Sequence, residues 1–304
     1  MKIRLTAAAV LSALLCASCV SGPSGAPSTP PDAASAARGA VLAAAGDCRG
    51  CHTDTKAKGP ELAGGAAIKT GFGNFYAPNI TFDKDHGIGT WSEADFARAM
   101  RHGKGAHGEY LYPAFPYPSF TGMTDGDIGD LYAYLRTAPT SAQPSKAQDV
   151  KFPFSVRPLM AFWRVLFFRS GALAPVAGQS AEWNRGRYLS ETVVHCQECH
   201  SPRNLLGAID KANGYSGNVD EPKAPNITPG NKTVAAYTVD NLVDLLDTGM
   251  TPDGDYMGGE MATVVEGTTK LSAADRHAIA VYVKSLPARA SKPAKPKAPV
   301  KAAS

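Results

Sequence analysis

The pentapeptide Cys196-Gln197-Glu198-Cys199-His200 and its earlier counterpart Cys48-Arg49-Gly50-Cys51-His52 share the pattern Cys-x-x-Cys-His. Haem is covalently attached through this pattern. Two thiols three positions apart can bond the two vinyl groups of one porphyrin, and the following histidine offers an imidazole to the iron. We therefore expect two haem c groups, with covalent attachment at Cys48, Cys51, Cys196 and Cys199 and proximal iron ligands at His52 and His200.

A single such pentapeptide would leave two different interpretations, a redox Cys-x-x-Cys pair or half of a zinc site. Zinc takes four ligands, usually from two knuckles at short separation. About half of the chain lies between the two motifs, and each lies inside a copy of a longer repeat. Both the redox pair and the zinc site are therefore disfavoured.

The sequence around the two motifs is duplicated. Ala77-Pro78-Asn79-Ile80-Thr81 recurs residue for residue at 224–228, and Arg38-Gly39 in an apolar helical pattern corresponds to Arg185-Gly186. Each copy ends in a predicted helix, after Thr124 and after Ser272, with an i, i+3, i+4, i+7 apolar stripe. Because the offset stays between 146 and 148, we interpret the chain as one fold repeated in tandem.

The chain then divides into six predicted segments. They are a signal peptide (1–19), a flexible Pro/Ser/Gly tether (20–34), a first haem domain (35–138), a linker (139–180), a second haem domain (181–287) and a disordered basic Pro/Lys/Ala tail (288–304). The linker is rich in aromatic residues and more apolar than a free connector. It is expected either to pack across both domains or to form a docking surface for a partner or a membrane.

The N-terminus has the pattern of an export signal. Lys2 and Arg4 precede an apolar run that is too short to span a bilayer. Cys16-Ala17-Ser18-Cys19 resembles a bacterial lipobox, although Cys16 replaces the usual leucine. We expect lipidation of Cys19 and membrane association on the periplasmic side; ordinary cleavage would instead leave a soluble periplasmic protein.

Most of the positive charge lies at the two ends of the chain. The formal net charge is +4, and without the cations of the signal and tail the remaining body has a net charge of −3. The haem domains are therefore mildly acidic, and no nucleic-acid partner is indicated.

A low-spin haem needs a sixth iron ligand, and methionine is one that raises the potential. For the second haem the candidates are Met250, Met257 and Met261. Only Met261 precedes the last predicted helix by the loop length typical of small c-type haem proteins, so Met261 is the predicted distal ligand and Met257 the alternative.

The equivalent position in the first copy is Phe115, which cannot bind iron. Met123, eight residues later, is the predicted distal ligand of the first haem. The second copy has Leu271 at that place, so a core role for Met123 is the alternative. In that case the sixth position would be filled by His107 or Met100, or would stay open.

A proximal histidine also needs a hydrogen-bond acceptor for its second ring nitrogen. We expect the carbonyl of Pro60 in the first copy and that of Pro202 in the second to accept this bond. Arg203 is a candidate partner for a haem propionate.

From Ser35 to Pro287 the sequence resembles the multihaem cytochrome c subunits of membrane-associated bacterial dehydrogenases that oxidise alcohols, gluconate or aldehydes. The residues that carry the resemblance are Ala77–Thr81, Gly87–Trp91, Leu111–Tyr117, Arg157–Met160, Ser180–Gly186 and Cys196–Asn204. The resemblance implies an all-α fold of two tandem class I cytochrome c-like domains. It also implies electron transfer from a dehydrogenase catalytic subunit to a respiratory-chain acceptor, either quinone or a terminal oxidase.

The chain departs from that family pattern in two respects. A third Cys-x-x-Cys-His motif, present in three-haem members, is absent, and several members carry methionine where Phe115 stands. A second functional class is a di-haem oxidoreductase that acts directly on peroxide or a sulfur compound. A sulfur-oxidising type would need an axial cysteine, and the only cysteines outside the haem motifs are Cys16 and Cys19. A peroxidase type would need an open first haem.

Overall fold

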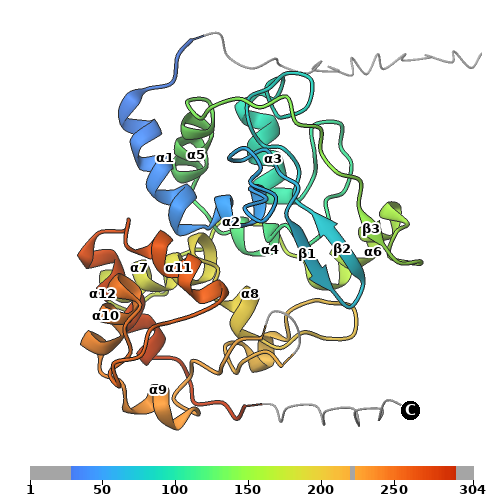
Figure 1. Ribbon diagram of the computed structural model, residues 1–304. Helices are drawn as coiled ribbons and strands as arrows, with labels where there is room; N and C mark the ends of the chain where they lie inside the picture. Colours follow the sequence, from blue (N-terminus) through green and yellow to red (C-terminus); the bar gives the residue numbers. More distant parts are fainter. Residues whose placement is uncertain (1–28, 220–222, 292–304) are drawn as a thin grey trace, which may run out of the picture.

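The computed structural model describes residues 29–219 and 223–291. The predicted signal peptide, Cys19, residues 20–28 of the tether and residues 292–304 of the tail lie outside the described residues. The described chain is mostly helical, with one small sheet (Figure 1). No helix within the described ranges is both long and apolar enough to cross a membrane.

The helices follow in two successive sets. Those of the first half are α1 (Ala33–Ala45), α2 (Cys48–His52), α3 (Glu93–His102), α4 (Tyr117–Phe120) and α5 (Asp125–Leu135). Those of the second half are α7 (Ala181–Tyr188), η2 (Leu189–Val193), α8 (Gln197–His200), η3 (Lys211–Asn213), α9 (Lys232–Ala236), α10 (Val239–Thr248), α11 (Glu260–Thr268) and α12 (Ala273–Lys284). Three of these helices begin at a capping side chain: Ser92, Thr124 and Ser272 each accept a hydrogen bond from the third backbone N–H of the helix.

In each half the first and last helices cross at a glycine. Gly39 of α1 lies against the carbonyl of Asp130 in α5, and Gly186 of α7 lies against the carbonyl of Ala278 in α12. The arginine before each glycine pairs with a carboxylate of the last helix. Arg38 bonds Asp130 at 2.6 and 2.8 Å, and Arg185 bonds Asp275 at 2.7 and 3.1 Å. The repeated Arg-Gly pair thus has the same structural role twice.

The expected helical class is confirmed in that the described chain is mostly helical. The expectation did not include the three-stranded antiparallel sheet of the first half. Its strands are β1 (Ala67–Thr70), β2 (Gly73–Tyr76) and β3 (Asp149–Val150), in the order β1-β2-β3. Ile68, Phe75 and Tyr76 favour extended structure, and Gly73 has φ 128°, a conformation for which glycine is suited. The third strand comes from the linker, so the linker begins as part of the first half.

The rest of the linker contains η1 (Arg157–Leu159) and helix α6 (Met160–Phe167). Met160, Trp163 and Phe168 are buried in a cluster that also contains Tyr117 of the first half and Ala208 of the second. The Trp163 indole donates a hydrogen bond of 2.9 Å to the carbonyl of Leu206. The linker therefore packs against residues of both halves.

The two halves share one hydrophobic core. Buried side chains from α1, α3 and α5 belong to the same cluster as those from η2, α10 and α12. A polar contact joins the halves at the edge of this cluster, where the Tyr188 hydroxyl accepts from the backbone N–H of Thr124 and donates to the carboxylate of Asp127. The halves are therefore packed together and are not separated by the linker (Figure 1).

The glycine crossings generate a stability prediction. A methyl group at Gly39 would overlap the carbonyl of Asp130, whereas at Gly126 of α5 the nearest atom is 3.9 Å away. We expect Gly39→Ala to lower the free energy of unfolding by about 1–3 kcal/mol. Gly126→Ala, the matched control, should leave it unchanged or raise it by up to about 1 kcal/mol. Urea unfolding followed by circular dichroism measures both; equal stability of the two variants would contradict the close crossing.

Candidate functional site

Each Cys-x-x-Cys-His pentapeptide forms one helical turn. The turn is α2 in the first half, and in the second half it is Cys196 followed by α8. The residue before each turn has a left-handed backbone conformation, with φ 48° at Asp47 and φ 43° at His195. On a helical turn, side chains three positions apart are neighbours on one side, so the two cysteines of each motif are placed to reach one cofactor edge.

The two histidines have the same hydrogen-bond partner. His52 Nδ1 lies 2.7 Å from the carbonyl oxygen of Pro78, and His200 Nδ1 lies 2.8 Å from that of Pro225. A carbonyl only accepts, so Nδ1 carries the proton and Nε2 keeps its lone pair for a metal. Burial lowers the pKa of both imidazoles and so favours their neutral form. The hydrogen bond to the carbonyl opposes this shift but is the smaller effect. This arrangement fits an iron-bound histidine.

The prediction that the carbonyls of Pro60 and Pro202 accept these hydrogen bonds is wrong. The Pro60 carbonyl instead accepts from the backbone N–H of Ala63, and that of Pro202 accepts from Asp210. Both are used in local loop turns. The acceptors that the structure does use, Pro78 and Pro225, belong to the pentapeptide that the two halves share without change. Its unchanged duplication was the signal in the sequence.

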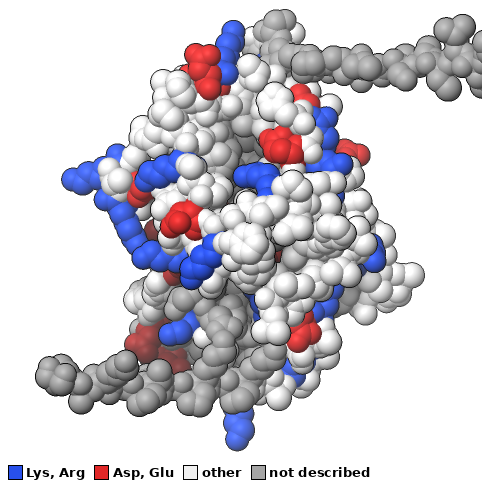
Figure 2. All heavy atoms as spheres, turned by 90° about the vertical axis from the view of Figure 1, so that its right-hand side faces the viewer, with Lys and Arg blue, Asp and Glu red and all other residues white. Residues whose placement is uncertain are grey.

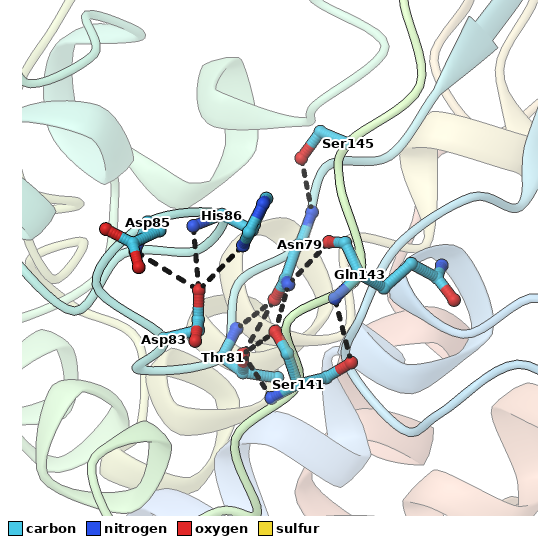
Figure 3. A network of polar contacts seen from close by, with 8 residues as sticks. All are labelled: Asn79, Thr81, Asp83, Asp85, His86, Ser141, Gln143 and Ser145. Atoms are coloured by element: carbon cyan, nitrogen blue, oxygen red, sulfur yellow. Dashed lines mark hydrogen bonds and ion pairs between the residues drawn. The ribbon is translucent and has the colours of Figure 1, made fainter.

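Side-chain hydrogen bonds hold the Pro78 carbonyl in place. The Asn79 amide oxygen accepts from the Thr81 N–H at 2.9 Å and from the Thr81 hydroxyl at 2.7 Å, while the amide nitrogen donates to the carbonyls of Ser141 and Gln143 (Figure 3). The Ser145 hydroxyl accepts from the Asn79 N–H at 3.0 Å. The start of the linker is thereby tied to the loop that orients His52.

The second half repeats this clamp. The Asn226 amide oxygen accepts from the Thr228 N–H at 2.8 Å and from its hydroxyl at 2.7 Å. The Asn226 amide nitrogen donates to the carbonyl of Arg289 at 2.8 Å. In both halves the segment that follows the last helix therefore passes over the proline loop. The shared geometry accounts for the Asn-x-Thr part of the repeated pentapeptide.

The difference in residue number between corresponding positions of the two halves is not constant, as was expected, but changes between the Cys-x-x-Cys-His motif and this clamp. Leu62 accepts a backbone hydrogen bond from Ile80 as Tyr215 does from Ile227, so these two residues correspond at an offset of 153. The loop after His200 is longer than that after His52, and the first half recovers the difference in the β1–β2 hairpin.

Tyr215 is buried in the second half. Burial raises the pKa of its hydroxyl, and its ring packs on that of Tyr282 with 6.3 Å between centroids.

The four motif cysteines are partly buried. Burial raises the pKa of Cys48, Cys51 and Cys196 to about 12 and that of Cys199 to about 11. Thioether formation consumes the thiol and needs no stable thiolate in the finished protein. Among the described residues, no group of three or more His, Cys, Asp or Glu side chains is placed to hold a metal ion.

The candidate distal residues differ in their surroundings. Met261, on the first turn of α11, is half-buried and packs against the core cluster. Met123 is 1% exposed in the same core. Leu271 is 4% exposed and, like Met123, donates its backbone N–H to the residue three positions earlier. The correspondence with Leu271 is what a packing role for Met123 predicts.

The remaining candidates also fall into two groups. Met100 in α3 is 5% exposed, and Phe115 packs on the ring of Phe120 with 5.5 Å between centroids. In contrast, Met250 and His107 are exposed, and Met257 is half-buried in a loop. Met100 and Met123 are thus the buried methionines of the first half, among the described residues.

The second motif contacts the first half through a buried carboxylate. Glu198 is 8% exposed; one of its carboxylate oxygens accepts from the Ser119 hydroxyl of α4 at 2.7 Å. The other oxygen accepts from the Arg203 guanidinium at 2.7 Å. Arg203 forms this ion pair and donates to the carbonyls of Glu198 and Gly207; its role as partner of a haem propionate stays a prediction.

His195 makes a second contact between the two motif regions. Its Nε2 donates to the carbonyl of Gly46 at 3.2 Å, and its ring meets that of Phe120 at 5.3 Å. Gly46 is two residues before Cys48, so the two attachment turns adjoin. Sequence reasoning missed Glu198, His195 and Ser119. The available signal was that Glu198 and His195 replace Gly50 and Asp47 of the first copy.

Most of the chain is similar in sequence to known proteins. The family model described as cytochrome c matches residues 36–139. A diheme cytochrome c-type protein of Cereibacter sphaeroides is 40% identical over 83% of this chain and 86% of its own length. A nicotinate dehydrogenase subunit of Pseudomonas putida is 44% identical over 86% of this chain, and the fructose dehydrogenase cytochrome subunit of Gluconobacter japonicus is 39% identical over 84%. The chain spans 22% and 53% of the lengths of these last two relatives.

The Glu198 contact generates the second prediction. Glu198→Ala would leave the Arg203 guanidinium and the Ser119 hydroxyl without their partner, so we expect it to lower the free energy of unfolding by about 2–4 kcal/mol. Glu182→Ala, which removes an exposed carboxylate paired with His277, is the control and should cost about 0–1 kcal/mol. Thermal unfolding of both variants checks this; a Glu198→Ala variant as stable as the control would show that the contact contributes nothing.

Proposed function

The chain belongs to the cytochrome c family, and from this premise we propose that it is an electron-transfer protein carrying two covalently bound haems. The observation that carries the proposal is the duplicated site. Each motif histidine has its Nδ1 proton bound to a proline carbonyl and its Nε2 left for iron. A redox Cys-x-x-Cys pair would not need either feature.

The proposed sites follow the motif residues. Cys48 and Cys51 hold the first haem, with His52 as the proximal ligand and Met123 as the distal ligand. Cys196 and Cys199 hold the second haem, with His200 as the proximal ligand and Met261 as the distal ligand. The proposed domains are residues 35–138 and 181–287, joined by the aromatic-rich linker 139–180. The matching helix crossings support two similar domains, and the two Asn-x-Thr clamps attach the segment that follows each of them.

The bound haems would supply iron that changes between the ferrous and ferric states. The chain's own residues have three tasks around them. The proline carbonyls orient the imidazoles, and the shared core excludes water from the motif surroundings. The contacts of Glu198 with Ser119 and of His195 with Gly46 keep the two attachment turns adjacent. Adjacency supports electron passage between the two sites without a mobile domain.

We propose a dehydrogenase catalytic subunit as the electron donor. Two relatives are named as subunits of nicotinate and fructose dehydrogenases, and further relatives as cytochrome c subunits of gluconate and alcohol dehydrogenases. The acceptor in this proposal is quinone or a terminal oxidase. The protein would be exported and held at the periplasmic side of the membrane through lipidated Cys19, which lies outside the described residues.

Purification from the native membrane in mild detergent tests the partner. We expect a stoichiometric large dehydrogenase, identified by mass spectrometry, whose substrate reduces the haems in the isolated complex. A protein that purifies alone in a redox-active low-spin state would be a freestanding carrier. In that case the dehydrogenase partner would be rejected, whereas electron transfer by the haems would stand.

The number of haems is tested on the intact protein. We expect a mass that exceeds the polypeptide mass by two haems, and the double variant Cys48→Ala/Cys51→Ala should retain one. Cys196→Ala/Cys199→Ala is the matched variant of the second site and should also retain one. If either double variant kept two covalent haems, the proposed attachment would be contradicted.

The distal ligands are tested by two variants that remove sulfur but keep volume. We expect Met261→Leu to convert one haem to a high-spin, five-coordinate state and to lower its potential. We expect Met123→Leu to do the same for the first haem. Electron paramagnetic resonance and redox titration report both. Unchanged low-spin signals in Met123→Leu would assign Met123 to packing, as in Leu271; high-spin iron in the parent protein would favour direct chemistry on a small substrate.

A further inference from the structure

Helix α6 carries apolar side chains on both of its faces. Met160 and Trp163 point into the protein and are 7% and 8% exposed. Phe162, Val165 and Leu166, at i, i+3 and i+4 spacing, are 70%, 71% and 63% exposed. A surface helix in a globular protein normally turns polar residues to this side. The outer face of α6 is therefore an apolar surface without a partner in the described chain.

Neighbouring residues enlarge this surface. Phe152 and Leu159 precede α6 and are 83% and 39% exposed. Leu205 is 96% exposed and adjoins Leu206, whose carbonyl receives the Trp163 hydrogen bond. We call this surface the linker face; its residues are Phe152, Leu159, Phe162, Val165, Leu166 and Leu205. Figure 2 views the molecule from the side on which α6 lies in Figure 1, and it shows wide uncharged areas there.

The segment of the linker that carries α6 has only positive charges. Residues 150–181 contain four cations and no aspartate or glutamate; the cations are Lys151, Arg157, Arg164 and Arg169. None of the four forms a salt bridge within the described parts of the chain. Arg157 and Arg164 bond backbone carbonyls, and their guanidiniums lie over the rings of Tyr112 and Tyr110. Lys151 and Arg169 are exposed, and the hydrogen bonds of Arg169 go to backbone carbonyls.

We propose that the linker face docks on an anionic lipid membrane, with the apolar side chains in the acyl boundary and the exposed Lys151 and Arg169 at the headgroups. A short helix with an apolar outer side and flanking Arg and Lys has the composition of an interfacial anchor. Protein interfaces carry a polar rim that forms hydrogen bonds with the partner. The exposed apolar residues of this face are all Phe, Leu or Val, which form no such bonds and which suit lipid.

Docking through this face would orient the whole molecule. Trp163 and Phe168 pack on Tyr117 of the first half, with ring centroids 6.5 and 4.9 Å apart, and Trp163 also bonds Leu206 of the second half. The linker face is thus fixed to both halves. This contact is separate from lipidation of Cys19 and from the proposed electron transfer, because it needs only residues of the linker and the adjoining loop.

Vesicle binding of the haem-loaded protein tests the proposal. The protein carries Cys19→Ser, with its processed N-terminus verified by mass, so that no acyl chain contributes. We expect binding to vesicles of phosphatidylglycerol and phosphatidylethanolamine, at least tenfold weaker binding to neutral phosphatidylcholine, and loss of binding at high salt. Phe162→Ser should weaken binding at least tenfold, and Arg169→Gln about fivefold.

Tyr256→Ser is the matched control, because Tyr256 is an aromatic residue that is 71% exposed in the second half. It should change vesicle binding by less than twofold. The haem absorption spectrum and the unfolding temperature are measured for every variant as a control for folding. Both should equal those of the parent protein. Binding that is absent, or equal in Phe162→Ser and Tyr256→Ser, would overturn the proposal. So would a protein partner that co-purifies in stoichiometric amount with the parent and is lost in Phe162→Ser while vesicle binding persists.

Discussion

The hydrogen bond from each motif histidine to a proline carbonyl is the constraint on which much of the structure depends. It sets the tautomer, and therefore which ring nitrogen is left for a metal. The carbonyl can serve only if its loop is held, and the loop is held by the Asn-x-Thr clamp. The clamp in turn binds the segment after the last helix of its half. A local turn thus becomes coupled to the end of the domain.

A similar coupling links the first and last helices to the motif. A glycine allows the two backbones to approach, and the arginine before it pairs with a carboxylate of the opposite helix. The close crossing positions the helix that leads into the motif, because α1 ends three residues before Cys48. The helix crossing and the placement of the Cys-x-x-Cys-His turn are therefore parts of one arrangement in each half.

The two halves are joined by groups that the duplication does not share. Glu198 occupies the place of Gly50, and its carboxylate reaches Ser119 in the first half. Burying a carboxylate is costly unless it is paired and hydrogen-bonded, and here Arg203 and Ser119 satisfy both oxygens. The asymmetry between the copies is thus what turns two similar domains into one di-haem unit in our proposal. The linker adds a second connection through Trp163.

The sequence by itself determined the two Cys-x-x-Cys-His motifs, the repetition around them and the mostly helical class, because these depend on local spacing and on repetition without change. It identified Ala-Pro-Asn-Ile-Thr as a repeat but not its purpose, since the carbonyl of Pro78 meets His52 only after a loop of 25 residues has folded back. Pro60 and Pro202 lie nearer to the motif histidines in sequence, but the tertiary structure uses their carbonyls elsewhere. The β1–β2–β3 sheet, the contact of Glu198 with Ser119 and the two-sided packing of α6 likewise join residues far apart in the chain. Such contacts are set by how buried polar groups and apolar faces are satisfied together, which no local pattern encodes.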